Sequence, residues 1–427
     1  MNEEILMESE RILNELDRIG KFGNKYRVSL PQEEVRILDK IHELGESIPD
    51  IETPKSQDQL VQAELKRRLT GDAFLLEQRL SPRHYDFDTV VSMYGIPAED
   101  ITGLRGWLES NREETLESID RLYQTKDIPN LEFGLSLDIP SVRKKSEKFA
   151  TKNIGRYHKH LGRLLQDLTG VGNFFGDIDV VPTDNPRSYF NPTRKTLAIG
   201  IPAICSSNED GSLNLNEMEL IRLYGHEGMG HAVNEVLSKS NGLPHFLTGN
   251  ATLTTATAES VAQFYQDVIF DDLKNSQKTQ RALGIQNDFE DIYADFVDTA
   301  HIQDFQQRLG QYAISVLGDR ALGDPNDPKV CAEKVRLLNE VAIDPSYGFH
   351  VVEGNRSNFD SEGNLNAGSV AELRYCAQPV QRALEEFFRQ GVVYEGEGRK
   401  KIDETFLKGF WTPTGFVDNA RLKAEEI

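Results

Sequence analysis

The segment Tyr-Gly-His-Glu-Gly-Met-Gly-His-Ala-Val-Asn at residues 224–234 carries the strongest structural signal in the chain. It places His226 and His231 on either side of Glu227, in a stretch with a helical pattern. In the common H-E-x-x-H motif the two histidines lie about 40° apart around an α-helix and bind one zinc ion together. Here they are five residues apart, which corresponds to about 140° on a regular α-helix.

The glycines of this segment indicate how the extra residue is accommodated. A π-bulge returns residues i and i+5 to one face of a helix, and such bulges concentrate at functional sites. Gly225, Gly228 and Gly230 occur within six residues, although each glycine costs a helix about 0.8–1.0 kcal/mol relative to alanine. Three glycines are unfavourable here unless the helix is distorted or another element approaches closely. The sequence therefore predicts a π-bulge in this segment.

A third ligand follows at Glu259, within Thr-Thr-Ala-Thr-Ala-Glu-Ser-Val-Ala-Gln-Phe-Tyr at 254–265. Small residues flank this glutamate, so the helix that carries it can approach the first helix closely. Two histidines and one glutamate leave a fourth position for water, as in catalytic zinc sites. We therefore predict one zinc ion per chain, bound by His226, His231 and Glu259. The alternative is that the histidines are unrelated polar residues and that Glu259 is a solvated or salt-bridged helix residue.

At these residues the sequence resembles the gluzincin metallopeptidases, in which two histidines of one helix and a glutamate of the next bind zinc. The segment HEGMGH at 226–231 has the spacing of the HExxGH motif of dipeptidyl peptidase III. The overall likeness is greater to a domain-of-unknown-function family of zinc peptidases with HExxPGHH and EGWALY motifs. Three further segments correspond to that family in order: SYFNP at 188–192, ESVAQFY at 259–265 and ELRYCAQPVQRAL at 372–384. The chain lacks the Pro-Gly pair and the last histidine of HExxPGHH.

The resemblance implies roles in catalysis. Glu227 is the expected general base, which takes a proton from a zinc-bound water and passes it to the leaving amine. Tyr375 is the expected stabiliser of the oxyanion, because it lies in the segment that corresponds to the family's RY. His350 and Tyr347 of Ser-Tyr-Gly-Phe-His at 346–350 are the alternatives for this role. A tyrosine at helical spacing is otherwise a core residue with a satisfied hydroxyl group.

Substrate contacts are expected from aromatic and basic residues of the same segments. Tyr189, Tyr347 and Arg374 are the predicted substrate-binding residues. Guanidinium groups bind carboxylates through two hydrogen bonds, so Arg187 and Arg194 are further candidates for binding a substrate carboxylate. For all these arginines the alternative is a solvated position on the surface.

The hydrophobic pattern predicts a mainly α fold with a substrate cleft between two helical halves. Helical periodicity dominates residues 1–169, which we assign to an N-terminal helical domain, and residues 170–427 to a zinc-binding catalytic domain. A small β insert is expected before the metal-binding helix, with short strands at Ile178–Val181 and Thr196–Ile201. The second strand is a candidate sheet edge for pairing with an extended peptide, and the alternative is a buried strand.

Composition excludes several classes of protein. The chain has 38% hydrophobic and 27% charged residues, an ordinary globular balance, and no apolar run approaches the length of a membrane span. A net charge of −21 disfavours nucleic acids and anionic membranes as partners. The acidic N-terminal residues are unlike a secretory signal. Three widely separated cysteines indicate reduced core residues of a cytoplasmic protein.

These observations together predict a zinc-dependent hydrolase that cleaves peptide bonds, with a peptide as its partner in the cleft. One alternative is a zinc hydrolase of a non-peptide amide or ester, because the metal chemistry is the same. The other is a catalytically inactive helical binding protein. The position of the cleaved bond within a peptide and the oligomeric state are left open by the sequence.

Overall fold

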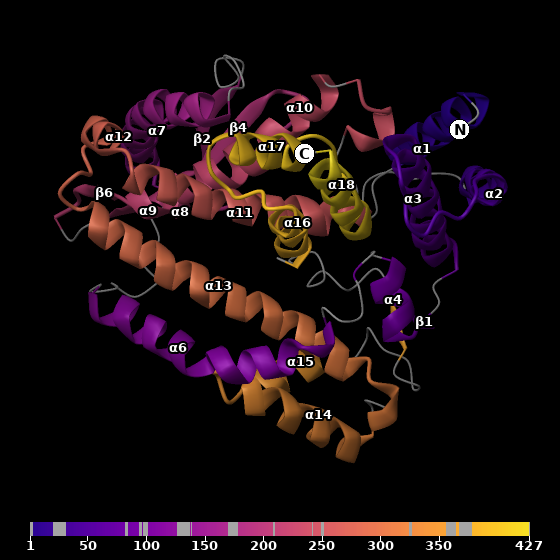
Figure 1. The fold of residues 1–427 in the computed structure, drawn as a ribbon. Coiled ribbons are helices and arrows are strands. Elements are labelled where there is room, and N and C mark those ends of the chain that lie inside the picture. Colours follow the sequence, from indigo (N-terminus) through magenta and orange to yellow (C-terminus); the bar gives the residue numbers. More distant parts are fainter. Residues whose placement is uncertain are drawn as a thin grey trace.

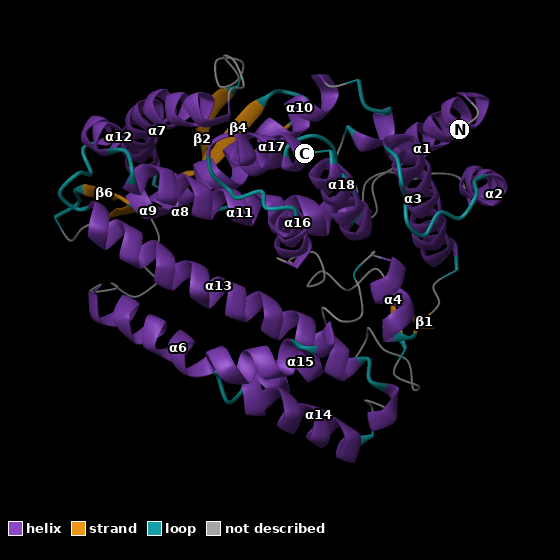
Figure 2. Ribbon diagram, viewed as in Figure 1, coloured by secondary structure: helices purple, strands orange, loops and turns teal. Residues whose placement is uncertain are grey.

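The predicted mainly helical fold is confirmed in the part of the chain that the computed structural model describes (Figure 2). The described residues are 3–19, 31–81, 84–93, 96, 101–125, 137, 139–169, 178–207, 210–240, 242–248, 252–323, 327–355, 364–366 and 378–426. None of the helices among them is both long enough and apolar enough to span a bilayer.

Most of the N-terminal region is helical. Its elements are α1 (Glu3–Ile19), α2 (Pro31–Ser47), α3 (Gln57–Leu80), β1 (His84–Tyr85), α4 (Phe87–Met93), α6 (Leu104–Thr125) and α7 (Pro140–Thr169). Ser56 begins α3 as an N-cap that accepts a hydrogen bond from the backbone N–H of Gln59. β1 pairs with β7 (Leu365–Asn366), which lies far away in sequence.

The predicted β insert is present and holds two small sheets. Its strands are β2 (Asp179–Thr183), β3 (Tyr189–Asn191), β4 (Thr196–Gly200), β5 (Cys205–Ser207) and β6 (Leu213–Leu215), with the short helix α8 (Ile201–Ile204) between β4 and β5. β4 lies in the middle of the first sheet, parallel to β2 and antiparallel to β3. The proposal that residues 196–201 form a sheet edge is therefore wrong. β4 is almost entirely apolar, and its buried residues pack into the core between two neighbouring strands.

The remaining elements surround the histidine segment. They are α9 (Glu217–Leu223), η2 (Tyr224–Val233), α10 (Asn234–Ser240), η3 (His245–Leu247), η4 (Thr252–Thr254), α11 (Thr255–Lys274), α12 (Gln277–Leu283), α13 (Phe289–Leu317), η5 (Arg320–Leu322), α14 (Pro328–Val341), α15 (Tyr347–Asn355), α16 (Gln378–Arg389), α17 (Gly396–Phe406) and α18 (Pro413–Glu425). α13 is a long helix between two groups of elements: α9 and α11 lie on one side, and α6, α14 and α15 on the other (Figure 1).

A buried lysine fixes the C-terminal end of α13. Lys334 of α14 has no solvent exposure. Its amino group donates to the carbonyl oxygens of Val316 at 2.9 Å, Leu317 at 2.6 Å and Asp319 at 3.3 Å. The last carbonyls of a helix lack partners within it, and a cation there interacts favourably with the negative end of the helix dipole. Lys334 thereby links α14 to α13.

Two hydrophobic cores hold the chain together, and each combines residues from both sides of position 170. In the first, Ile154 and Tyr157 of α7 join residues of α9, α11 and α18. In the second, Leu108 of α6 joins residues of α13 and α14. The boundary between residues 169 and 170 stays a prediction. Of the cysteines in the described residues, Cys205 is buried and Cys331 is partly buried.

Candidate metal centre

A π-helix brings the two histidines together. η2 begins at Tyr224, directly after α9, and ends at Val233, where α10 continues the chain. In its i→i+5 hydrogen-bond pattern His226 and His231 face the same side. Their ring centres are 5.0 Å apart, with an angle of 85° between the ring planes. The predicted distortion of the helix is confirmed.

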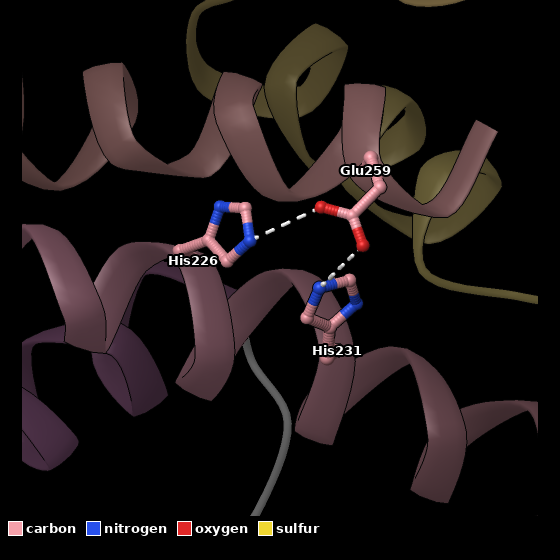
Figure 3. A group of neighbouring side chains, drawn as sticks. All are labelled: His226, His231 and Glu259. Carbon is pink, nitrogen blue, oxygen red and sulfur yellow. Dashed lines mark ion pairs between the residues drawn. The ribbon is translucent and has the colours of Figure 1, made fainter. Parts of the chain in front are cut away.

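Glu259 of α11 points between the two imidazole rings (Figure 3). One carboxylate oxygen lies 3.3 Å from Nε2 of His226, and the other lies 3.6 Å from Nε2 of His231. The ligand atoms of the three residues all lie within 4.8 Å of one another, and each side chain is partly buried. In the described part of the chain no other group of three or more His, Cys, Asp or Glu side chains has this geometry.

The donor atoms fit a zinc ion. Ligands at about 2.0–2.1 Å from a tetrahedral zinc lie about 3.3 Å from one another. Each histidine Nε2 lies close to that spacing from one oxygen of Glu259, His226 at 3.3 Å from Oε2 and His231 at 3.6 Å from Oε1. Burial lowers the pKa of His231, although the Glu259 carboxylate opposes this shift. The imidazole is therefore neutral near pH 7 and keeps a lone pair for a metal.

Two glycines allow η2 to lie against α11 at backbone distance. A Cβ atom at Gly230 would lie 2.2 Å from Cα of Ala262, and one at Gly225 would lie 2.5 Å from the carbonyl oxygen of Tyr265. Any side chain at these two positions would push the helices apart. Gly225 and Gly230 thus lie in the π-helix and also where its backbone approaches α11 most closely.

Glu227 is held beside the histidines by the β insert. The backbone N–H of Phe190 in β3 donates to Oε2 of Glu227 at 3.2 Å. β3 is an outer strand of its sheet, and this N–H points toward η2 instead of toward β4. Glu227 lines the same cavity as His226, His231 and Glu259. A carboxylate in this position can exchange a proton with a molecule bound next to the three ligands.

The cavity at this centre has a volume of about 500 Å³ and a polar lining. α13 forms the wall opposite the histidines, where three glutamines and a glycine line the cavity. The lining residues are Arg222, His226, Glu227, His231, Glu259, Gln263, Gln266, Gln303, Gln306, Gln307 and Gly310. They all belong to the C-terminal half, so a contribution of the N-terminal half to a cleft stays a prediction.

A second cavity of about 540 Å³ shares four of these glutamines and extends between α11 and α13. Asp267, Asp271 and Asp304 line it. Partial desolvation of its carboxyl group in this cavity, together with the neighbouring carboxylates of Asp271 and Asp304, raises the pKa of Asp267 to about 7, although the residue as a whole is exposed. Between α11 and α13, glutamine amides thus line the space near the histidines, and carboxyl groups line it farther away.

The other predicted site residues are not among those that line the described cavity. Tyr189 lies exposed on β3, next to Phe190, which contacts Glu227. Tyr347 and His350 lie on α15, which packs against α14. Arg187 and Arg194 are exposed near the ends of β3. Tyr375 and Arg374 lie outside the described residues, so their roles stay predictions.

The glutamines around the centre were not predicted from the sequence. Gln263 and Gln266 follow Glu259 by four and seven residues, which places them on the same face of α11. Gln266 is 5% exposed, and its amide contacts Nδ1 of His226 at 2.5 Å. This helical spacing was a usable signal. The contribution of α13, by contrast, depends on packing that no local pattern indicates.

The chain matches no protein-family model, no curated protein and no solved structure. The resemblance to gluzincins therefore rests on the motif residues and stays a prediction.

Proposed function

We propose that the chain is a zinc-dependent hydrolase that cleaves peptide bonds, with zinc bound by His226, His231 and Glu259. The observation that carries the proposal is the spacing of the three donor groups, 3.3 and 3.6 Å between Glu259 and the two histidines. A second carboxylate, Glu227, lines the same cavity but is not part of the donor group. Two histidines and a glutamate with an open fourth position are typical of catalytic zinc.

The chemistry divides between the metal and the protein. When bound, zinc supplies a Lewis acid that polarises a water molecule and the carbonyl group of the substrate. Glu227 acts as general base: an Oε atom accepts the proton of the attacking water and then donates it to the leaving nitrogen. The N–H of Phe190 holds Oε2 of this carboxylate at 3.2 Å, which fixes its orientation toward the cavity.

The surroundings of the centre favour a peptide as the substrate. β3 is an outer strand beside Glu227, so an extended chain can pair with the part of its edge that η2 does not cover. The amide groups of Gln263, Gln303 and Gln307 offer both donors and acceptors to the peptide units of such a chain. A polar lining without a large apolar pocket suits recognition of the main chain more than recognition of one apolar side chain.

Metal analysis tests the proposal first. Purified protein should contain close to one zinc per chain by mass spectrometry, and His231→Ala should lose it after dialysis against a mild chelator. Iron in place of zinc would contradict the zinc assignment, since two histidines and one carboxylate also bind Fe(II) in oxygenases. No retained metal, even after zinc is offered, would favour a helical binding protein.

Peptide digestion tests the reaction itself. The zinc-loaded protein should cleave members of a peptide library, while Glu227→Gln keeps its zinc and loses at least about 100-fold in rate, the usual contribution of a general base. Cleavage of small esters or non-peptide amides without any peptide cleavage would contradict the assigned substrate class.

A further inference from the structure

Gln266 of α11 contacts His226 at the ring nitrogen that does not face Glu259. Its amide Nε2 lies 2.5 Å from Nδ1 of His226, and its side chain is only 5% exposed. The other ring nitrogen of His226, Nε2, faces Glu259 at 3.3 Å. The ring is therefore held between two residues of one helix, one at each nitrogen.

Protonation of the ring determines what Gln266 does. A histidine that binds a metal through Nε2 needs a lone pair there, so its proton must lie on Nδ1 and be donated to an acceptor. The amide oxygen of Gln266 becomes that acceptor when the amide rotates by about 180°, a change that keeps the same shape. The short contact to His226 is then an N–H···O hydrogen bond from Nδ1.

From this geometry we propose that Gln266 is a positioning residue for the metal centre, which fixes both the orientation and the tautomer of His226. The inference rests on the zinc site proposed above. Acceptors at the second nitrogen of a ligating histidine normally contribute a factor of 10–100 in metal affinity.

The backbone keeps this partner in place. A Cβ atom at Gly225, the residue before His226, would lie 2.8 Å from Cα of Gln266 and 3.0 Å from its backbone nitrogen. The start of η2 thus lies directly on the backbone of α11 at Gln266, and little freedom is left in the distance between ring and amide. The side chain of Gln266 is almost completely buried, so water cannot easily replace its amide as the acceptor for His226.

Gln266→Met tests the proposal with a side chain of similar length and no acceptor. Zinc affinity, measured by competition with a chelator at fixed pH, should fall 10–100-fold. The visible spectrum of the cobalt-loaded protein should also change, because the ring of His226 is free to turn. Gln306→Met is the matched control: Gln306 lines the same cavity from α13, the wall opposite the histidines. It should keep the affinity and the spectrum of the wild type.

Gln266→Glu is the second variant and restores an acceptor of the same size. Its zinc affinity should equal or exceed that of the wild type, because a carboxylate acceptor makes the imidazole a stronger ligand. A loss of affinity in this variant, or an unchanged affinity and cobalt spectrum in Gln266→Met, would overturn the inference. If His231→Ala loses zinc while Gln266→Met does not, only the role of Gln266 fails. If the wild type binds no zinc, the proposed function fails and this inference with it.

Discussion

Replacing Gly230 by alanine tests whether the contact between η2 and α11 brings the three proposed zinc ligands together. The new Cβ would lie 2.2 Å from Cα of Ala262 and 2.5 Å from its Cβ. Carbon atoms in contact lie about 3.5–4.0 Å apart, so the two backbones must separate by about 1 Å or more. Ala262 follows Glu259 by three residues on α11, nearly one helical turn, so Glu259 moves away with it.

This displacement has two measurable effects. Metal–ligand distances tolerate about 0.2 Å, so a shift of about 1 Å should reduce zinc affinity by at least about 100-fold. Overpacking costs about 1–3 kcal/mol of stability, while alanine regains about 0.8–1.0 kcal/mol of helix propensity. The metal-free variant should therefore lose at most about 2 kcal/mol in urea unfolding and remain folded. Competition with a chelator measures the affinity on the same samples.

Gly155→Ala provides the control for helix propensity alone. Gly155 lies in α7, and a Cβ atom there meets nothing within 4 Å. This variant should gain up to about 1 kcal/mol in stability and keep its zinc affinity. Wild-type zinc affinity in Gly230→Ala would refute the argument, because it would show that the ligands are not positioned by this backbone contact.

Two further substitutions test the supports of the cavity wall. Lys334→Met removes the cation bound to three carbonyl oxygens at the end of α13. It should lower the free energy of unfolding in urea by about 2–3 kcal/mol. Lys329 is exposed, so Lys329→Met should change little, and equal stabilities of Lys334→Met and the wild type would contradict the role of Lys334. Asp267→Asn tests the raised pKa of Asp267, about 7 in the folded protein. Because the folded state then binds more protons than the unfolded state, stability falls as pH rises from about 4 to 7. Asp267→Asn should have a higher Tm than the wild type at pH 8 and an equal Tm near pH 4. The difference at pH 8 should be small, since water reaches this carboxyl group. An equal Tm at pH 8 would contradict the raised pKa of Asp267.

The grouping of the two histidines with Glu259 could be predicted from the sequence because its signals are local. Histidines five residues apart among glycines require a distorted helix if they are to meet, and the structure contains that π-helix. Glu259 was predictable from the small residues around it, and the structure places it 3.3 and 3.6 Å from the histidines. Both inferences depend on the chemistry and spacing of neighbouring residues.

Other parts depend on long-range pairing, which the pattern of one segment does not contain. The strand at 196–200 has the same apolar composition whether it lies at the edge or in the middle of a sheet, and its neighbours β2 and β3 decide the matter. Most of the segment 346–350 belongs to α15, which packs on α14 and α13, so the catalytic role predicted for Tyr347 and His350 stays a prediction. Glutamines of α13 reach the cavity only because α13 lies opposite α11.

The stretched motif and the composition of α11 depend on each other. A π-helix is wider than an α-helix, so its backbone lies closer to a neighbouring helix, and this is possible only when the facing residues of both helices are small. Here Gly230 meets Ala262, and Gly225 meets the backbone at Tyr265 and Gln266. A larger residue on either side would remove Glu259 from the histidines without changing any ligand. The H-E-x-x-x-H spacing alone is therefore weak evidence that two histidines meet a third donor. The evidence becomes stronger when glycines flank the histidines and a following helix carries alanine three residues after its glutamate.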